Sequence, residues 1–381
     1  MKILFCTNSL GTLGGIERVT IVKANALAEI PGNEVYIAFT DKMGYPKTVH
    51  PISVKVHIVD LDVNHWNNNY KSRIQKILCP LKKFFLHFWR LSNWVKNNNP
   101  EVIISVGQSE KYILPFLKVP VKIREVHFNS TYRFFTYKSK WKAIILNFMD
   151  FKVLSIFYDK YYLLTKQDKE ENFNMNIKFS WMHNPSSFSK SLKRNTMYNR
   201  SPTVLAVGRL NYQKNFEALI RIWSETISFI DQKWCLKIIG DGPEMEKLQK
   251  LSKYYNLGDR LILYGRSNRI KEEMENASIF ALTSRFEGFA LVLTEALACG
   301  LPVISFDTKY GPKDIIHDSV DGFIIEGANE EMFKEKLVEL IHNIDLRENF
   351  SIEAYKLIDD FDVNRISKKW MNEYMNLLLN K

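Results

Sequence analysis

The fold is decided first by the stretch KILFCTNSLGTLGGIERVTIVKANALAEIPGNEVYIAFT, residues 2–40. It begins with a short apolar run, passes through the glycine-containing turn GTLGG, continues with helical periodicity from about residue 16 to 30, and ends in a second apolar run. A buried strand, a turn, a helix and another buried strand in this order form the βαβ unit of a parallel sheet. The sequence therefore predicts an α/β fold.

The same alternation continues along the whole chain. In the first half, further strands are predicted at 54–61, 101–107, 121–127 and 161–165. In the second half they are predicted at 203–210, 234–240, 261–265, 278–284, 302–307 and 322–326, with helical segments between most of them. Because 381 residues exceed one hydrophobic core of usual size, we expect two doubly wound α/β domains, 1–182 and 183–363, joined through the polar segment 181–202.

The excess of positive charge is confined to the first half. Residues 1–180 hold 26 Lys and Arg against 14 Asp and Glu, whereas residues 181–381 hold 27 against 28. Such an imbalance favours an anionic partner at the first domain, either a membrane surface or a nucleic acid. The N-terminus reads as a strand and not as a secretory signal, and the four cysteines lack metal-ligand or redox spacing, so we expect a cytoplasmic protein with reduced thiols.

Two acid-free segments carry this charge. Seven basic residues lie between Asp62 and Glu101 among many aromatic and aliphatic ones: Lys71, Arg73, Lys76, Lys82, Lys83, Arg90 and Lys96. Residues 126–149 add Arg133, Lys138, Lys140 and Lys142 beside Phe134, Phe135, Tyr137 and Trp141. Basic aromatic helices can lie in an anionic membrane interface, although an ordinary amphipathic helix packed on the sheet is the alternative. Phe85 and Trp89, which fall off the core-facing stripe, favour the membrane.

A second informative stretch is EGFALVLTEALACG, residues 287–300. The pattern predicts a helix that starts near Phe289 and stops at the glycine cap Gly300. The amides at its start would form a site for a phosphate or carboxylate. Glu295 stands in an otherwise apolar helix, where a buried carboxylate needs hydroxyl or amide partners such as a ribose diol. The alternative places Glu295 on a solvent-facing stripe and makes Glu287 an ordinary helix-end acid.

The segment VGRLNYQKN, residues 207–215, follows the first strand of the second half. Ligands of open parallel sheets bind beyond the carboxyl ends of strands, which is where Arg209 and Lys214 would project. A guanidinium and an ammonium at that edge could hold a diphosphate and stabilise the charge that develops as it leaves. Taken singly, each is as easily a solvated surface cation.

These motifs resemble a known family. GRL…KN, GDGPE, S-x-x-EG-F and the E-x7-E pattern that ends in EALACGLPVIS resemble the retaining glycosyltransferases of family four. The resemblance implies the GT-B architecture, in which two doubly wound Rossmann-like domains face each other across a cleft and a nucleotide-activated sugar is the donor. The GGIERV loop, the Asn184–Pro185 junction and a C-terminal helix, 364–381, that crosses back to the first domain are in the expected places.

The resemblance also implies roles for individual residues. Glu295 looks like the ribose-binding glutamate, Glu287 like the acid beside the donor sugar, and Arg209 with Lys214 like the pair that holds the leaving diphosphate. His127 matches a histidine that faces the donor sugar, against the alternative of a structural side chain. Further substrate-binding positions are expected at Gly14, Gly15, Arg266, Gly288, Phe289, Ala290 and Leu291, and the segment 305–316 is expected to shape the donor pocket.

The implied reaction transfers a hexose or N-acetylhexosamine from a UDP-linked donor to a glycan or lipid-linked acceptor, with retention and without a metal or cofactor, in cell-surface polysaccharide synthesis. The sequence leaves open whether Glu287 is a covalent nucleophile. A GDP-mannose-dependent enzyme is the first alternative. A nicotinamide dinucleotide enzyme is another, although GTLGG misses G-x-G-x-x-G. A non-catalytic membrane or nucleic-acid binder is the third, although RNA-binding signatures are absent and no nucleic acid is expected as partner.

Overall fold

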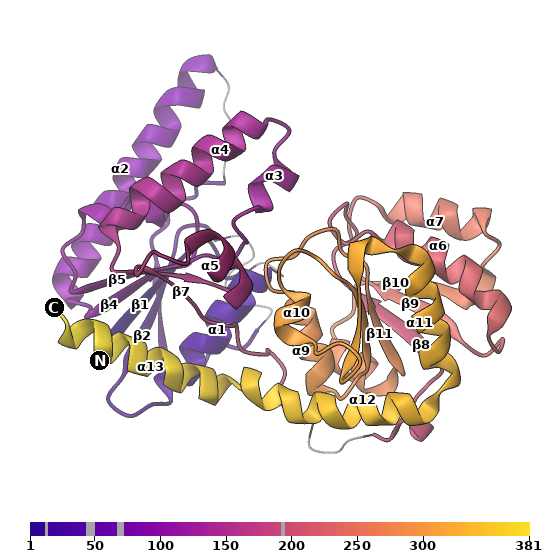
Figure 1. Ribbon diagram of the computed structural model, residues 1–381. Coiled ribbons are helices and arrows are strands. Elements are labelled where there is room, and N and C mark those ends of the chain that lie inside the picture. The colour runs from indigo at the N-terminus through magenta and orange to yellow at the C-terminus, as the bar shows by residue number, and fades with distance from the viewer. Residues whose placement is uncertain (12–13, 43–49, 67–71, 192–194) are drawn as a thin grey trace. The chain divides into compact units, whose positions relative to one another are not determined.

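The computed structural model describes residues 1–11, 14–42, 50–66, 72–191 and 195–381 and separates into two compact units (Figure 1). The first unit comprises Met1–Pro185 together with Val363–Lys381, and the second comprises Ser186–Asp362. Each unit is built on one sheet in which all strand pairs are parallel. The predicted α/β class with two doubly wound domains is thereby confirmed.

The sheet of the first unit has the strand order β3-β2-β1-β4-β5-β6-β7. Its strands are β1 (Lys2–Thr7), β2 (Glu34–Phe39), β3 (Val56–Asp60), β4 (Val102–Ser105), β5 (Val121–Glu125), β6 (Lys160–Leu163) and β7 (Phe179–Trp181). The order reverses between β1 and β4, which places a topological switch point at their carboxyl ends. The sequence did not predict β7, because three residues are too few to show a period.

The helices of the first unit are α1 (Gly15–Ala28), α2 (Arg73–Asn98), α3 (Tyr132–Thr136), α4 (Lys140–Phe148), α5 (Lys166–Phe173) and α13 (Val363–Leu379). Short 3₁₀ or π turns lie at Glu110–Tyr112, Leu114–Phe116, Met149–Val153 and Leu154–Phe157. Helix α13, yellow in Figure 1, belongs to this unit and packs against α1 and β5. Its Trp370 ring meets Tyr162 of β6 edge-on, with ring centroids 4.5 Å apart.

The sheet of the second unit has the strand order β10-β9-β8-β11-β12-β13. Its strands are β8 (Thr203–Val207), β9 (Cys235–Ile239), β10 (Leu261–Gly265), β11 (Ile279–Leu282), β12 (Val303–Phe306) and β13 (Gly322–Ile325). Its helices are α6 (Phe216–Thr226), α7 (Met245–Tyr254), α8 (Ile270–Asn276), α9 (Leu291–Ala298), α10 (Pro312–Ile315), α11 (Glu330–His342) and α12 (Ile344–Leu357). Its 3₁₀ turns lie at Met197–Asn199, Ile227–Phe229, Gly258–Arg260, Glu326–Ala328 and Ile358–Phe361. The switch point falls between β8 and β11.

Helix α2 carries two kinds of apolar residue. Leu91 and Val95 are buried against the sheet, as the amphipathic alternative required. Leu78, Leu81, Phe85 and Trp89 form a second stripe at helical spacing, and each of their side chains is more than half exposed. The helix therefore packs on the core with one stripe and presents an apolar, partly aromatic stripe to solvent. Within the described residues, no helix is both long enough and apolar enough to cross a bilayer.

Part of the positive charge of the first unit is structural. Lys83 donates to the Asn64 carbonyl at 2.6 Å, and Arg90 donates to the carbonyls of Leu61 and Asp62, both at 2.6 Å. Lys76, Lys82, Lys96, Lys138, Lys140 and Lys142 are exposed. Lys71 lies outside the described residues, as does the side chain of Arg73. The surface available to an anionic partner is therefore smaller than the sequence count suggests.

The buried side of α2 also contains a titratable group. His87 is 1% exposed, and its Nδ1 lies 3.1 Å from Nε2 of His65. Burial, with a smaller contribution from His65, lowers the pKa of His87 to about 3. Below about pH 6.5 this histidine binds a proton in the unfolded chain but stays neutral in the folded chain. The free energy of unfolding therefore falls as the pH drops from about 6.5 toward 3.

The free energy of unfolding of the wild type should fall between pH 7 and pH 5 because of His87. We expect this fall to be smaller by roughly 2 kcal/mol in His87→Gln, which keeps a polar partner for His65. Urea titrations at the two pH values measure this difference. The same substitution at the exposed His57 of β3 is the control and should leave the difference in place. An unchanged pH dependence in His87→Gln would show that the imidazole titrates normally in the folded protein.

Candidate active site

The candidate site lies at the carboxyl edge of the second sheet, where β8 and β11 end beside each other. The loop after β8 contains the predicted Arg209 and Lys214, and the loop after β11 contains the predicted Glu287 and Gly288. Because the strand order reverses between these two strands, both loops open onto the crevice in which α/β sheets bind ligands.

Several hydrogen bonds join the two loops. The amide of Arg285 donates to the Gln213 carbonyl at 2.8 Å, and Gln213 Nε2 donates to the Phe286 carbonyl at 3.1 Å. Arg285 Nη1 donates to the Tyr212 carbonyl at 2.7 Å, and its guanidinium lies 4.2 Å from the centre of the Tyr212 ring. The loops therefore hold each other in place, so the side chains that they carry are positioned before any ligand arrives.

Lys214 and Glu287 form a partly buried ion pair at this junction. Lys214 Nζ lies 2.7 Å from Glu287 Oε1, and their side chains are 16% and 7% exposed. Ser284 Oγ donates to the same carboxylate oxygen at 2.6 Å, and Gln213 Nε2 lies 3.4 Å from Oε2. A carboxylate so well bonded is fixed in direction. The structure thus brings together two predicted residues, each bonded to the other.

Arg209 has different surroundings. It is exposed on the loop after β8 and forms no ion pair with any described residue. The side chain of Lys214, in contrast, packs on the backbone of Gly208. A Cβ added to Gly208 would lie 3.0 Å from Lys214 Cε. Of the two predicted cations, Lys214 is held in one position and Arg209 is left with its donors available to a ligand.

Helix α9 begins later than the sequence predicted. Its first residue is Leu291 and its N-cap is Ala290, so the start expected near Phe289 is wrong by two residues. The reason is that Ala290 adopts the left-handed conformation, with φ 59° and ψ 57°. This conformation is uncommon for a residue with a Cβ and stores strain, which is typical of sites where the backbone must be aimed. The predicted glycine stop is present, because Gly300 has φ 57°.

Glu295 is 2% exposed, so the alternative that placed it on a solvent-facing stripe is wrong. Its Oε1 accepts a short hydrogen bond from the hydroxyl of Ser187. Ser186, the preceding residue, donates from Oγ to the Thr294 carbonyl at 3.3 Å and so ties this segment to α9. The sequence identified Glu295 but gave no indication that Ser187 would reach it across more than a hundred residues.

The segment 305–316 packs directly on the loop before α9. Gly311 has φ 109°, and a Cβ at this position would lie 3.3 Å from the carbonyl carbon of Phe289. Only glycine allows both the conformation and the close approach. The segment that was expected to shape the donor pocket therefore lies against the predicted Phe289, which is itself 3% exposed.

A similar close approach joins the GDGPE turn to the loop after β8. A Cβ on Gly240 would lie 1.8 Å from the Gly208 carbonyl oxygen, and one on Gly242 would lie 2.3 Å from that of Leu210. Arg266, which was expected to flank the base, binds this turn, with its Nε 3.0 Å from Asp241 Oδ2. Arg266 is exposed at the end of β10, one strand beyond β9 at this edge of the sheet.

The predicted residues of the first unit lie at the carboxyl edge of its own sheet. Gly14 caps α1 in an extended conformation, with φ −70°, and Gly15 is the first residue of that helix. His127 follows β5, and its Nε2 lies 3.3 Å from Glu125 Oε2. Burial lowers the pKa of His127, and Glu125 offsets part of this shift.

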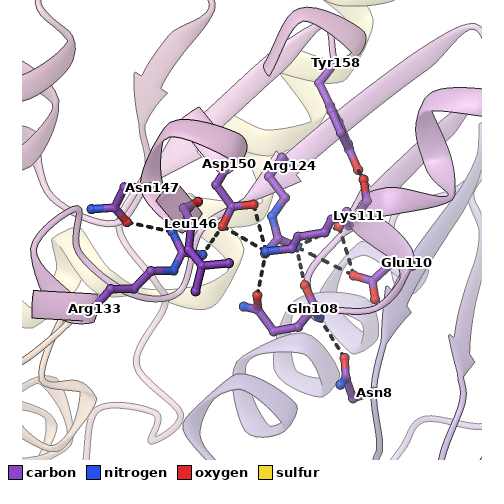
Figure 2. Close-up of polar contacts among 12 residues, drawn as sticks. Asn8, Gln108, Glu110, Lys111, Arg124, Arg133, Leu146, Asn147, Asp150 and Tyr158 are labelled. Carbon is purple, nitrogen blue, oxygen red and sulfur yellow. Dashed lines mark hydrogen bonds and ion pairs between the residues drawn. The ribbon is translucent and has the colours of Figure 1, made fainter. Parts of the chain in front are cut away.

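A buried charge cluster at the same edge was not predicted (Figure 2). Asp150 accepts from Lys111, whose Nζ lies 2.8 Å from Oδ1, and from Arg133. Arg124 of β5 lies 3.7 Å from Glu110. Burial would raise the pKa of Asp150, but Lys111, Arg133 and Arg124 together hold it below its ordinary value. Arg133, which was assigned to the membrane-facing segment, is therefore a structural cation that anchors α3.

The residues that sequence reasoning missed are partners of the predicted ones. Gln213 and Ser284 bind Glu287, and Ser187 binds Glu295. Gln213 and Ser284 belong to motifs quoted from the sequence, so proximity to those motifs was the available signal. Nothing in the sequence distinguished Ser187 from the other serines of the polar segment.

Comparisons with known proteins show the family of the chain. The model of the family Glycosyl transferases group 1 matches residues 187–357. The chain is 30% identical over 380 residues to the amylovoran biosynthesis glycosyltransferase AmsD of Erwinia amylovora, covering 98% of this chain and 99% of the relative. It is 28% identical, over 97% of both chains, to an alpha-1,4-N-acetyl-D-galactosaminyltransferase of Campylobacter jejuni that is named for an undecaprenol-linked substrate.

Among solved structures, a TarM variant of S. aureus, determined with UDP, superposes with a TM-score of 0.79. The match covers 98% of this chain and 99% of that one at 14% sequence identity, so it concerns the fold alone. The GT-B fold implied by the sequence motifs is confirmed. Together with the near full-length similarity to AmsD, it shows that the chain is a glycosyltransferase that belongs to the group 1 family.

Proposed function

We propose that this glycosyltransferase moves a hexose or N-acetylhexosamine from a UDP-sugar to a glycan or lipid-linked acceptor with retention of anomeric configuration, in cell-surface polysaccharide synthesis. The observation that carries the proposal is the Lys214–Glu287 pair, whose 2.7 Å contact fixes a cation and an acid at the switch point of the second sheet. The names of the Erwinia and Campylobacter relatives favour polysaccharide synthesis and an N-acetylhexosamine, and the UDP in the TarM structure favours uridine.

The proposed reaction breaks the bond between the anomeric carbon and the diphosphate oxygen and forms a bond to the acceptor oxygen. The acceptor hydroxyl attacks from the face that the diphosphate leaves, and the leaving phosphate oxygen accepts its proton. Lys214, Arg209 and the start of α9 stabilise the negative charge on the diphosphate, the task that a divalent cation performs elsewhere. Glu287 lies beside the donor sugar, where its fixed charge stabilises positive charge at the anomeric carbon.

A screen of UDP-, GDP-, ADP- and dTDP-sugars by thermal shift tests the donor. A ligand that binds only the folded state raises Tm according to its occupancy, so UDP-sugars should raise it most. Proton NMR of the product from the best donor then reports the anomeric configuration. Stabilisation by GDP-mannose instead would make the protein a mannosyltransferase, and binding of NADH without any nucleotide-sugar would overturn the proposal.

We also propose that the first unit attaches the enzyme to the inner face of the cell membrane as a peripheral protein. The exposed stripe of α2 has a counterpart on α4, where Trp141, Ile144, Ile145 and Phe148 are 45 to 76% exposed at helical spacing. Lys138, Lys140 and Lys142 flank this second stripe. Apolar stripes bordered by lysines complement an anionic membrane interface, which would hold a lipid-linked acceptor near the enzyme.

Replacing Lys138 and Lys140 together with glutamine should weaken binding to vesicles that contain anionic lipid by roughly 30-fold, since each lysine near such a surface contributes about 1 kcal/mol. Vesicle co-sedimentation at low ionic strength measures the change. Lys250→Gln with Lys253→Gln removes equal charge from exposed positions on the second unit and serves as the matched control. Equal weakening by both pairs would mean that net charge, and not this surface, governs attachment.

A further inference from the structure

A buried chain of charges leads from the interior of the first unit to His127. Lys23 of α1 is 1% exposed, and its Nζ lies 2.5 Å from Glu125 Oε1. The second oxygen of the same carboxylate, Oε2, lies 3.3 Å from His127 Nε2. The side chains of Glu125 and His127 are 4% and 3% exposed. Each oxygen of Glu125 thus faces a different partner, one on α1 and one just beyond the end of β5.

The C-terminal helix closes this chain from the other side. Lys23 Nζ lies 4.1 Å from the centre of the Trp370 ring of α13, so an aromatic face and a carboxylate surround the ammonium. Tyr374, also on α13, is fully buried near Glu125, and burial together with that negative charge raises the pKa of its hydroxyl. An unpaired charge in such surroundings would be strongly destabilising, so the lysine and the glutamate require each other.

The position of Glu125 restricts what His127 can do. His127 Nε2 is buried, and its 3.3 Å contact with Glu125 is not aligned as a hydrogen bond, so no described residue accepts from this nitrogen. A buried ring nitrogen facing a carboxylate at this distance carries the proton, which leaves Nδ1 as an acceptor in the neutral ring. Lys23 balances the charge of Glu125, so the two together are neutral. The ion pair therefore does not stabilise a doubly protonated, charged imidazole at His127.

We propose that Glu125 is a positioning residue for the transfer reaction: together with Lys23 and Trp370 it holds His127 as a neutral imidazole protonated at Nε2, with Nδ1 free to accept a hydrogen bond from a substrate hydroxyl. A neutral acceptor suits an uncharged sugar and disfavours one that bears a carboxylate. The role assigned to His127 rests on the proposed function, whereas its tautomer does not.

The titration behaviour agrees with this arrangement. The charged groups that act on His127 are Glu125, Lys23 and Arg124, the last from the opposite face of β5. Burial lowers the pKa of His127. Burial would raise the pKa of Glu125, but Lys23 and His127 together hold the pKa of that carboxyl at about 2. Near neutral pH the glutamate is therefore ionised and the histidine neutral.

Long-range proton–nitrogen NMR of protein labelled at its histidines tests the tautomer without any substrate. The His127 signals are assigned by their loss in His127→Gln. In the wild type we expect the Nε2-protonated form, and in Glu125→Gln a mixture of tautomers and a lower pKa, because the carboxylate that raises it is gone. Lys23→Met combined with Glu125→Gln removes both buried charges and should give the same mixture without leaving an unpaired ammonium.

Glu110→Gln is the matched control, since Glu110 is an equally buried glutamate of the same unit that bonds Ser105 Oγ at 2.9 Å and does not contact His127. With an active donor, Glu125→Gln should lower kcat by roughly 10- to 100-fold with little change in the donor KM, a size usual for partners that orient a functional histidine. An Nδ1-protonated or charged His127 in the wild type, or a tautomer unaffected by Glu125→Gln, would overturn the inference. The predicted tautomer in a protein that transfers no sugar would uphold the positioning while removing the proposed function.

Discussion

Replacing Lys214 with methionine should reduce turnover by about 100- to 1000-fold, the usual effect of removing one preorganised group that stabilises transition-state charge. Methionine keeps most of the apolar stem, which packs on Gly208, so the loss reports the ammonium and not the packing. The effect should fall mainly on kcat, because the charge on the diphosphate grows as the bond to the sugar breaks. Steady-state kinetics with the donor found by thermal shift measure it.

The control is Lys247→Met. Lys247 also pairs with a glutamate of the second unit, its Nζ lying 2.5 Å from Glu217, but its own side chain is 58% exposed. Exposed pairs of this kind contribute little, so turnover and stability should stay close to wild type. Turnover near wild type in Lys214→Met as well would remove Lys214 from the reaction and with it the main support for the proposed function.

A second comparison separates catalysis from the ion pair itself. Removing Lys214 leaves Glu287 buried without its cation, which could disturb the loop by itself. In the double variant Lys214→Met with Glu287→Gln no unpaired charge remains, because Ser284 and Gln213 can still bond the amide. If the single substitution acted only through a strained loop, the double variant would recover turnover. We expect no recovery, since the double variant lacks both proposed catalytic charges.

The strands and most helices could be predicted because each shows its own period. All six strands of the second sheet were expected, since each is a short apolar run bounded by turn residues. Glu287, Glu295 and Lys214 could also be singled out, because each is a polar residue at a strand end or inside an apolar helix. The neighbouring sequence of a residue does not show which distant residue it contacts in the fold. The Lys214–Glu287 contact joins positions 73 apart and exists because two loops are tied together through Gln213 and Arg285.

Two errors have a common physical cause. The start of α9 was placed too early because Ala290 gives no sign, as Gly or Asn would, that the backbone turns left-handed there. The membrane-facing charge was overestimated because Arg133 and Arg90 look like any surface cation in sequence, yet one is buried on Asp150 and the other binds backbone carbonyls. Both features are imposed by tertiary contacts, which a local pattern does not contain.

Glu295→Gln should weaken UDP binding by about 100-fold. If the carboxylate accepts two hydrogen bonds from the ribose diol, each bond to a charged group contributes about 1.5 kcal/mol or more, and a neutral amide retains only a part of this. The fold should survive, because the glutamine carbonyl can still accept from Ser187. Isothermal titration calorimetry with UDP gives the ratio of the two Kd values.

The decisive measurement pairs this variant with 2′-deoxy-UDP. If Glu295 binds the diol, the wild type should bind the deoxy compound more weakly than UDP, while Glu295→Gln should bind the two almost equally, because the group that distinguishes them is gone. Ser187→Ala serves as control, since it removes the hydroxyl that bonds Glu295 but keeps the carboxylate, and should preserve most of the preference for UDP. Equal discrimination in wild type and Glu295→Gln would assign the buried glutamate to holding the 186–187 segment on α9, and the ribose would have to be bound elsewhere.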